Sequence, residues 1–159
     1  SVLLRPHHKT IKNSKKLINS ITNTFGKNPN FILEEGVIPF NSLNDSVCMI
    51  SDWSGISLEY AFVFERPIIF IDVPKKILNP NSNDIHLEPI EVSIREDIGY
   101  IVSPENLSTI PSLINNQSNN SQNFNDHIDQ IRKKTVYHIG ESARIGSDYI
   151  QELNNELNN

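Results

Sequence analysis

The sequence predicts an α/β domain in which a parallel β-sheet carries helices on both faces. Short apolar runs alternate with longer segments of helical period, which is typical of successive strand and helix units. The 159 residues suffice for one domain with its own core. The single cysteine, Cys48, excludes an internal disulfide and favours a reducing compartment. We therefore expect one domain over residues 1–159.

Five apolar runs are the candidate strands. They are Ser1–Arg5, Asn30–Glu34, Ser46–Ser51, Pro67–Asp72 and Gly99–Val102. The first is expected to be buried, which suggests that the chain is part of a larger protein. The fourth is β-branched, continuous and bounded by prolines, so we expect it at the centre of the sheet.

Helical periodicity predicts the elements between and after these strands. They are Lys9–Phe25, Ser54–Phe64, Ser103–Ile114, Phe124–Tyr137 and Ser142–Leu157. The second of these should bury Ile56, Tyr60 and Val63 against the sheet. Residues 75–97 are expected to be irregular and functional, and the Asn/Ser-rich residues 115–125 to form a polar loop.

Composition excludes several classes of function. Lys and Arg number 14 against 19 Asp and Glu, a formal net charge of −5, which disfavours a nucleic-acid binder. No apolar run approaches the ~20 residues of a membrane span. No Cys/His spacing indicates a metal site, and no glycine-rich dinucleotide or P-loop motif is present. We expect no bound cofactor or metal and a cytoplasmic location.

The strongest local signal is the polar turn between the strand ending at Ser51 and the helix beginning at Ser54. Unpaired N–H groups and the dipole at a helix start favour a phosphate, and ligands of open α/β sheets lie beyond the carboxyl ends of the strands. The candidate diphosphate contacts are Asp52, Ser54, Gly55 and Ser57. Glu59, about one helical turn further on, is placed to reach a ribose.

An alternative interpretation of this turn is purely structural. In that interpretation Asp52 or Ser54 only caps the helix, Trp53 packs at the surface, and Glu59 is solvated. Because strand, polar turn and helix is a common sequence of elements, the pattern alone does not choose between the two.

Basic residues outside this turn are weaker candidates. His7, after the first strand, is a candidate catalytic or phosphate-binding group, and Arg5 and Arg95 are possible phosphate contacts. Lys75 or Lys76 follows the central strand. On the pattern alone, a solvated turn or a surface ion pair is the favoured interpretation of Arg5, His7 and the two lysines, and a surface salt bridge explains Arg95 equally well.

Four segments together resemble, in order, the C-terminal half of the CDP-glycerol glycerophosphotransferase family, the teichoic-acid and capsule polymerases. They are Arg5-Pro-His7, Ile50–Gly55 with Glu59-Tyr-Ala61, Arg66–Asp72 and Arg95–Gly99. The resemblance implies a GT-B fold, two Rossmann-like domains facing across a cleft, with the nucleotide donor held by the C-terminal one.

The resemblance also implies roles for individual residues. His7 matches the histidine associated with the donor phosphates and catalysis. Asp52, Ser54 and Gly55 match the turn that meets the diphosphate, and Glu59 matches an acidic position suited to the ribose. His8, Trp53 and Gly55 depart from the commoner proline, tyrosine and serine.

The expected function is that of a donor-binding domain for transfer of a glycerophosphate-like group from CDP-glycerol to a cell-wall or capsule polymer. The resemblance implies an N-terminal domain and a polymer acceptor as partners, with the parent protein peripheral on the inner face of the membrane. Two alternatives stay open: a GT-B sugar-nucleotide glycosyltransferase or UDP-sugar epimerase, and a non-enzymatic α/β interaction module.

Overall fold

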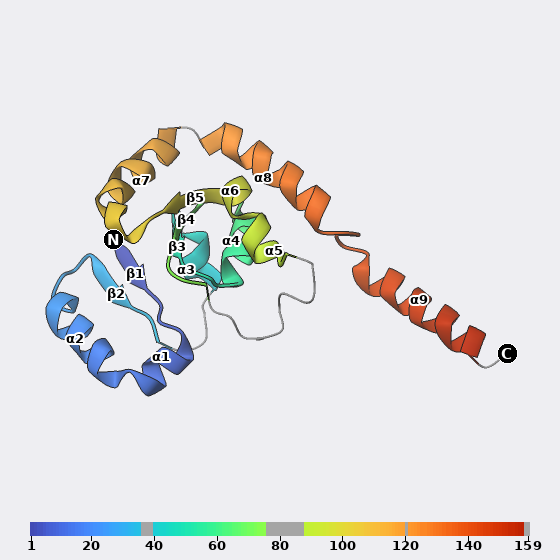
Figure 1. The fold of residues 1–159 in the computed structure, drawn as a ribbon, viewed down its shortest axis with the longest axis horizontal. Coiled ribbons are helices and arrows are strands. Elements are labelled where there is room, and N and C mark those ends of the chain that lie inside the picture. Colours follow the sequence, from blue (N-terminus) through green and yellow to red (C-terminus); the bar gives the residue numbers. More distant parts are fainter. Residues whose placement is uncertain (36–39, 76–87, 120, 158–159) are drawn as a thin grey trace. The chain divides into compact units, whose positions relative to one another are not determined.

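The computed structural model describes residues 1–35, 40–75, 88–119 and 121–157 (Figure 1). They fall into two compact units, Ser1–Leu43 (unit 1) and Asn44–Asn159 (unit 2). Every strand pairing among the described residues is parallel, so the predicted α/β class is confirmed. The predicted strands lie in two sheets, β1-β2 and β3-β4-β5.

Unit 1 is a strand, helix, strand arrangement. Strands β1 (Val2–Leu4) and β2 (Phe31–Leu33) pair with Val2 opposite Phe31. The predicted helix between them is two helices, α1 (His8–Asn13) and α2 (Lys15–Phe25). The break is at Ser14, whose φ of −125° and ψ of 44° are not helical. Serine favours helix ends because its side chain competes for backbone hydrogen bonds.

The prediction that the first strand is buried is wrong. Val2 is 63% exposed and Ile32, on the neighbouring strand, is 48% exposed. When a two-stranded sheet packs against a single layer of helices, part of the apolar surface of its strands stays exposed.

Unit 2 is built on β3 (Met49–Ser51), β4 (Ile68–Ile71) and β5 (Gly99–Val102). The prediction that the strand after Pro67 is central is confirmed, because β4 pairs with β3 on one side and β5 on the other. Gly99 lies opposite Ile68, and a Cβ there would be 2.1 Å from the Ile68 carbonyl oxygen. Only glycine allows this close approach.

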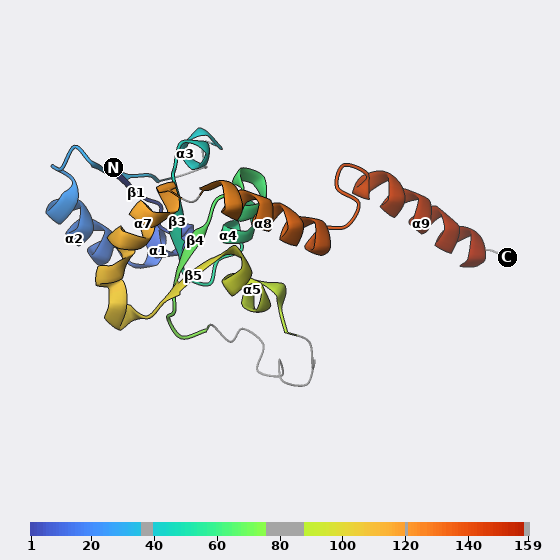
Figure 2. The ribbon, with the colours of Figure 1, turned by 90° about the horizontal axis from the view of Figure 1, so that it is seen from above.

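Helices cover the sheet of unit 2 and complete its core. Helix α4 (Ile56–Phe64) precedes β4, and the short α5 (Ile90–Ser93) and α6 (Arg95–Ile98) follow it. Helix α3 (Phe40–Asn44) spans the point in the chain where unit 1 ends and unit 2 begins. Helix α8 (Ser121–Thr135) lies against α4 and α6 (Figures 1 and 2). The fully buried large side chains are Tyr60, Ile68, Ile69, Ile98 and Ile128.

Burial on α4 corrects one part of the prediction. Tyr60 is buried as expected, and its hydroxyl hydrogen-bonds with Ser46. Val63 is 56% exposed, because the buried side of this helix runs through Ser57, Tyr60 and Ala61, at helical spacing.

The remaining elements are the 3₁₀ helix η2 (Pro104–Thr109), α7 (Ile110–Asn119) and α9 (Ser142–Leu157). Ser103 caps η2, since its Oγ accepts from the Glu105 N–H. The predicted loop over 115–125 is wrong: α7 and α8 occupy its described residues. Asn, Ser and Gln are weak helix formers but do not forbid a helix as proline does. Residues 88–97 also contain short helices, and 76–87, with Lys76, lie outside the described residues.

Candidate functional site

Two segments meet where strands β3 and β4 end. The turn Asp52–Gly55 follows β3, and the segment from Asp72 to Lys75 follows β4. Trp53 joins the two, because its Nε1–H donates to the Val73 carbonyl oxygen at 2.7 Å. The carboxyl edge of a parallel sheet is where open α/β folds bind ligands.

Helix α4 begins at this edge without a side-chain cap. Gly55 is the N-cap residue, with φ −59° and ψ −27°, and has no side chain to cap the helix. The N–H groups of Ser57 and Leu58 donate to the carbonyl oxygens of Ser54 and Gly55. Within the described residues, the N–H groups of Gly55 and Ile56 have no hydrogen-bond partner. These two donors are therefore available to an anion.

The other predicted residues of this segment differ in accessibility. Asp52 and Glu59 are exposed. Ser57 was expected to donate to the diphosphate, but it is 3% exposed and its hydroxyl donates to the Ser54 carbonyl oxygen. A buried hydroxyl needs such a partner, so its proton is not directed at a ligand in this structure. A Cβ on Gly55 would meet nothing within 4 Å.

Arg95 comes from α6 and lies beside the Trp53 turn. Its side chain is 4% exposed, and Nη1 donates to Asp72 Oδ1 at 3.2 Å. Its guanidinium carbon is 3.9 Å from the centroid of the Trp53 ring and 4.8 Å from that of Phe70. Nε and Nη2 are buried with no hydrogen-bond partner in the described part of the chain.

Arg5 and His7 belong to unit 1, and their side chains make local contacts. Arg5 Nε donates to Glu34 Oε2 at 2.8 Å, and Nη2 donates to Glu34 and to Ser42 Oγ. This agrees with the ion-pair interpretation of Arg5. His7 caps α1: its Nδ1 accepts from the Lys9 N–H at 3.2 Å. A neutral His7 in this state carries its proton on Nε2, which makes that nitrogen a donor.

The lone cysteine is not an activated nucleophile. Burial raises the pKa of the Cys48 thiol, which keeps it protonated near neutral pH. Burial likewise raises the pKa of Tyr60, although hydrogen bonds from Ser46 and Arg66 partly oppose this. Tyr60 is part of the buried core of unit 2.

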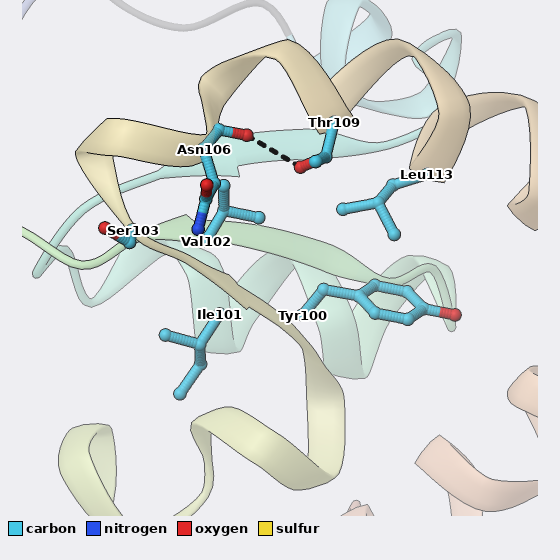
Figure 3. A pocket seen from close by; sticks show the side chains of 7 residues that line it. All are labelled: Tyr100, Ile101, Val102, Ser103, Asn106, Thr109 and Leu113. Atoms are coloured by element: carbon cyan, nitrogen blue, oxygen red, sulfur yellow. Dashed lines mark hydrogen bonds between the residues drawn. The ribbon is translucent and has the colours of Figure 1, made fainter.

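An open pocket of about 410 Å³ lies where β5 passes into η2 and α7 (Figure 3). Its lining residues are Tyr100, Ile101, Val102, Ser103, Asn106, Thr109 and Leu113. Thr109 Oγ1 donates to the Asn106 carbonyl oxygen across one side. None of the candidate site residues predicted from the sequence lines this pocket.

The sequence interpretation missed the link between Arg95 and the turn. Asp72 and Trp53 hold this arginine in place, although 23 residues separate Arg95 from Asp72. The available signal was the acidic residue directly after the central strand, at the ligand-binding edge. No periodicity connects it with an arginine on a later helix.

The described residues contain no group of three or more His, Cys, Asp or Glu side chains placed to hold a metal ion. Among the same residues, no helix has the length and apolar character needed to cross a membrane. Comparison of the chain with known family models, curated proteins and solved structures finds no match.

Proposed function

We propose that unit 2 binds the diphosphate of a nucleotide donor at the carboxyl edge of β3 and β4. The observation that carries this proposal is the meeting of two kinds of unsatisfied donor beside one turn. The N–H groups of Gly55 and Ile56 are free at the start of α4, and the buried Arg95 guanidinium lies over Trp53 with two unpartnered nitrogens. Convergent donors of this kind favour an anion.

The full proposal follows the resemblance to the CDP-glycerol glycerophosphotransferases. The chain supplies the C-terminal, donor-binding half of a GT-B enzyme at the inner face of the membrane. Its donor is CDP-glycerol or a related CDP-alditol, and its acceptor is a cell-wall or capsule polymer. Glu59 is assigned to the ribose, and Asp52 and Ser54 to the turn that meets the diphosphate.

The proposed reaction requires a general base for the acceptor and stabilisation of charge on the donor phosphates. An acceptor hydroxyl attacks the phosphorus next to glycerol, a new P–O bond forms, and the bond to the bridging oxygen breaks to release CMP. The acceptor's proton goes to a general base, which we assign to the N-terminal domain. Helix N–H groups stabilise the negative charge that develops on the departing phosphate. The assignment of His7 of unit 1 to the donor phosphates rests on the resemblance alone and stays a prediction of the sequence.

Gly55 offers a sharp test of the turn. A side chain there enters open space, and both Asn and Asp are good N-cap residues, so Gly55→Asn and Gly55→Asp should fold. Asp alone places a negative charge where the diphosphate binds. Calorimetry with CDP-glycerol should show wild-type-like affinity for Gly55→Asn and a loss of about tenfold or more for Gly55→Asp, from like-charge repulsion.

The same titrations separate the competing functions. CDP, UDP, GDP and a UDP-sugar are tested beside CDP-glycerol on the full chain. Preference for the UDP-sugar would select the glycosyltransferase or epimerase alternative. No binding of any nucleotide to the wild type, or equal affinity of the Asn and Asp variants, would overturn the proposed site and favour an interaction module.

A further inference from the structure

Arg95 carries an inference that deepens the proposed function and rests on it. Its guanidinium is held on three sides: the Trp53 ring at 3.9 Å, the Phe70 ring at 4.8 Å, and Asp72 Oδ1 at 3.2 Å from Nη1. Helix α6, which carries Arg95, lies beside β5 in unit 2 (Figure 1), and Phe70 belongs to β4. The plane and direction of the guanidinium are therefore fixed before any ligand arrives.

The nitrogens of Arg95 that lack a hydrogen-bond partner among the described residues lie together on one edge of its guanidinium. Asp72 takes Nη1, which leaves Nε and Nη2 without a partner in the described part of the chain. These two nitrogens form one edge of the guanidinium, and their N–H bonds are parallel. That edge matches two oxygens of a phosphate or carboxylate, the bidentate geometry that distinguishes arginine from lysine.

The surroundings favour a phosphoryl group as the acceptor. The ring over Arg95 belongs to the same turn as the free N–H groups of Gly55 and Ile56. Lys75 Nζ lies 6.0 Å from the centroid of that ring, so a second cation is close. Buried donors normally have partners, and a ligand is the simplest source of the missing acceptors.

We propose that the Nε–Nη2 edge of Arg95 binds two oxygens of one phosphoryl group of the donor, with Asp72 and Trp53 as positioning residues. Because Nε and Nη2 are buried in the free chain, binding shifts the side chains around them. Trp53 is the only tryptophan, so its fluorescence reports that shift directly.

The test titrates pyrophosphate, CDP-glycerol and cytidine into the full chain and follows Trp53 fluorescence. Saturable changes are expected with pyrophosphate and CDP-glycerol but not with cytidine, which has no phosphate. Arg95→Lys keeps the charge but loses the two-donor edge, and should weaken both ligands by about ten- to a hundredfold. Lys134→Gln, which removes one positive charge from an exposed position on α8, is the matched control and should bind like the wild type.

Asp72→Asn tests the same geometry through an expected gain in affinity for pyrophosphate. The amide oxygen still accepts from Nη1, but the competing negative charge is gone, so pyrophosphate should bind several-fold more tightly at low salt. A structural Arg95 predicts no such gain. This variant also decides the question if Arg95→Lys fails to fold.

The outcomes separate the two proposals. Nucleotide binding that is unchanged in both Arg95→Lys and Asp72→Asn would overturn the role of Arg95 and leave the turn as the site. Absence of any nucleotide or pyrophosphate binding to the wild type would overturn both.

Discussion

Each unit places an arginine near the end of a parallel strand, and the two side chains differ in how their donors are used. In unit 1, Arg5 gives Nε and Nη2 to Glu34 and a further bond to Ser42. In unit 2, Arg95 is more deeply buried, at 4% exposed against 17%, yet among the described residues its side chain makes one hydrogen bond, to Asp72. An unpartnered buried donor costs free energy, so Arg95 carries a penalty that Arg5 does not.

The sheets that carry these arginines differ in the same direction. Ile68 and Ile69 of β4 are 0% exposed, whereas Val2 of β1 is 63% exposed. Unit 2 therefore has a packed core that can hold a polar group with unpartnered donors in place, whereas β1 of unit 1 is largely exposed. A functional site often lowers the stability of a protein, and a rigid core around the site compensates for that loss.

The largest effect should come from the core of unit 2. Ile69→Ala removes a fully buried side chain from the central strand, and should lower the free energy of unfolding by about 2–5 kcal/mol. Ile32→Ala, at a site 48% exposed on β2, should cost less than about 1 kcal/mol. Urea unfolding followed by circular dichroism and by Trp53 fluorescence measures both; equal losses would mean that the two sheets are equally packed.

The contrast between the arginines shows how far the sequence leads. Alternation and β-branched runs located the strands, including the central one, because burial on both faces leaves a continuous apolar pattern. The sequence proposed both Arg5, after the first strand, and Arg95, before the last one, as phosphate contacts, and nothing in the pattern distinguished the two. Whether a guanidinium is satisfied depends on partners such as Glu34 and Asp72, which only the pairing of distant segments brings together.

Two other sequence expectations failed for related reasons. The Asn/Ser-rich residues 115–125 were expected to form a loop, but propensity is a weak constraint where tertiary packing favours a helix. Ser57 was expected to face a ligand, yet the helix turns it toward the core beside Tyr60. Position in a motif did not reveal which side of the helix would be covered.

Replacing each arginine with methionine should give effects of opposite sign. Arg5→Met leaves Glu34, 18% exposed, without its cation and should destabilise the chain by about 1–3 kcal/mol. Arg95→Met removes a buried charge with unmet donors and leaves Asp72, 52% exposed, in contact with water. It should raise the free energy of unfolding by about 1 kcal/mol while abolishing anion binding.

Urea unfolding of the two variants provides the measurement, with pyrophosphate titration beside it. A stability gain paired with lost binding marks a residue kept for function. If Arg95→Met destabilises the chain more than Arg5→Met does, the contrast drawn between the two sites is wrong.

The smallest expected effect is a change in how the stability of unit 2 depends on acid pH. On α8, hydrogen bonds from Lys133 and Arg132 hold the pKa of Asp129 below its ordinary value. A depressed carboxyl pKa contributes stability that is complete above the unfolded value and lost as pH falls through the folded one. The wild type should therefore lose stability below about pH 4, and Asp129→Asn should flatten that dependence of stability on pH.

Asp126→Asn is the matched control and should leave the dependence of stability on pH unchanged. Asp126 is exposed on the same helix and makes no ion pair among the described residues. Melting temperatures between pH 2.5 and 6 decide this, and an unchanged slope in Asp129→Asn would assign the acid sensitivity to other carboxylates.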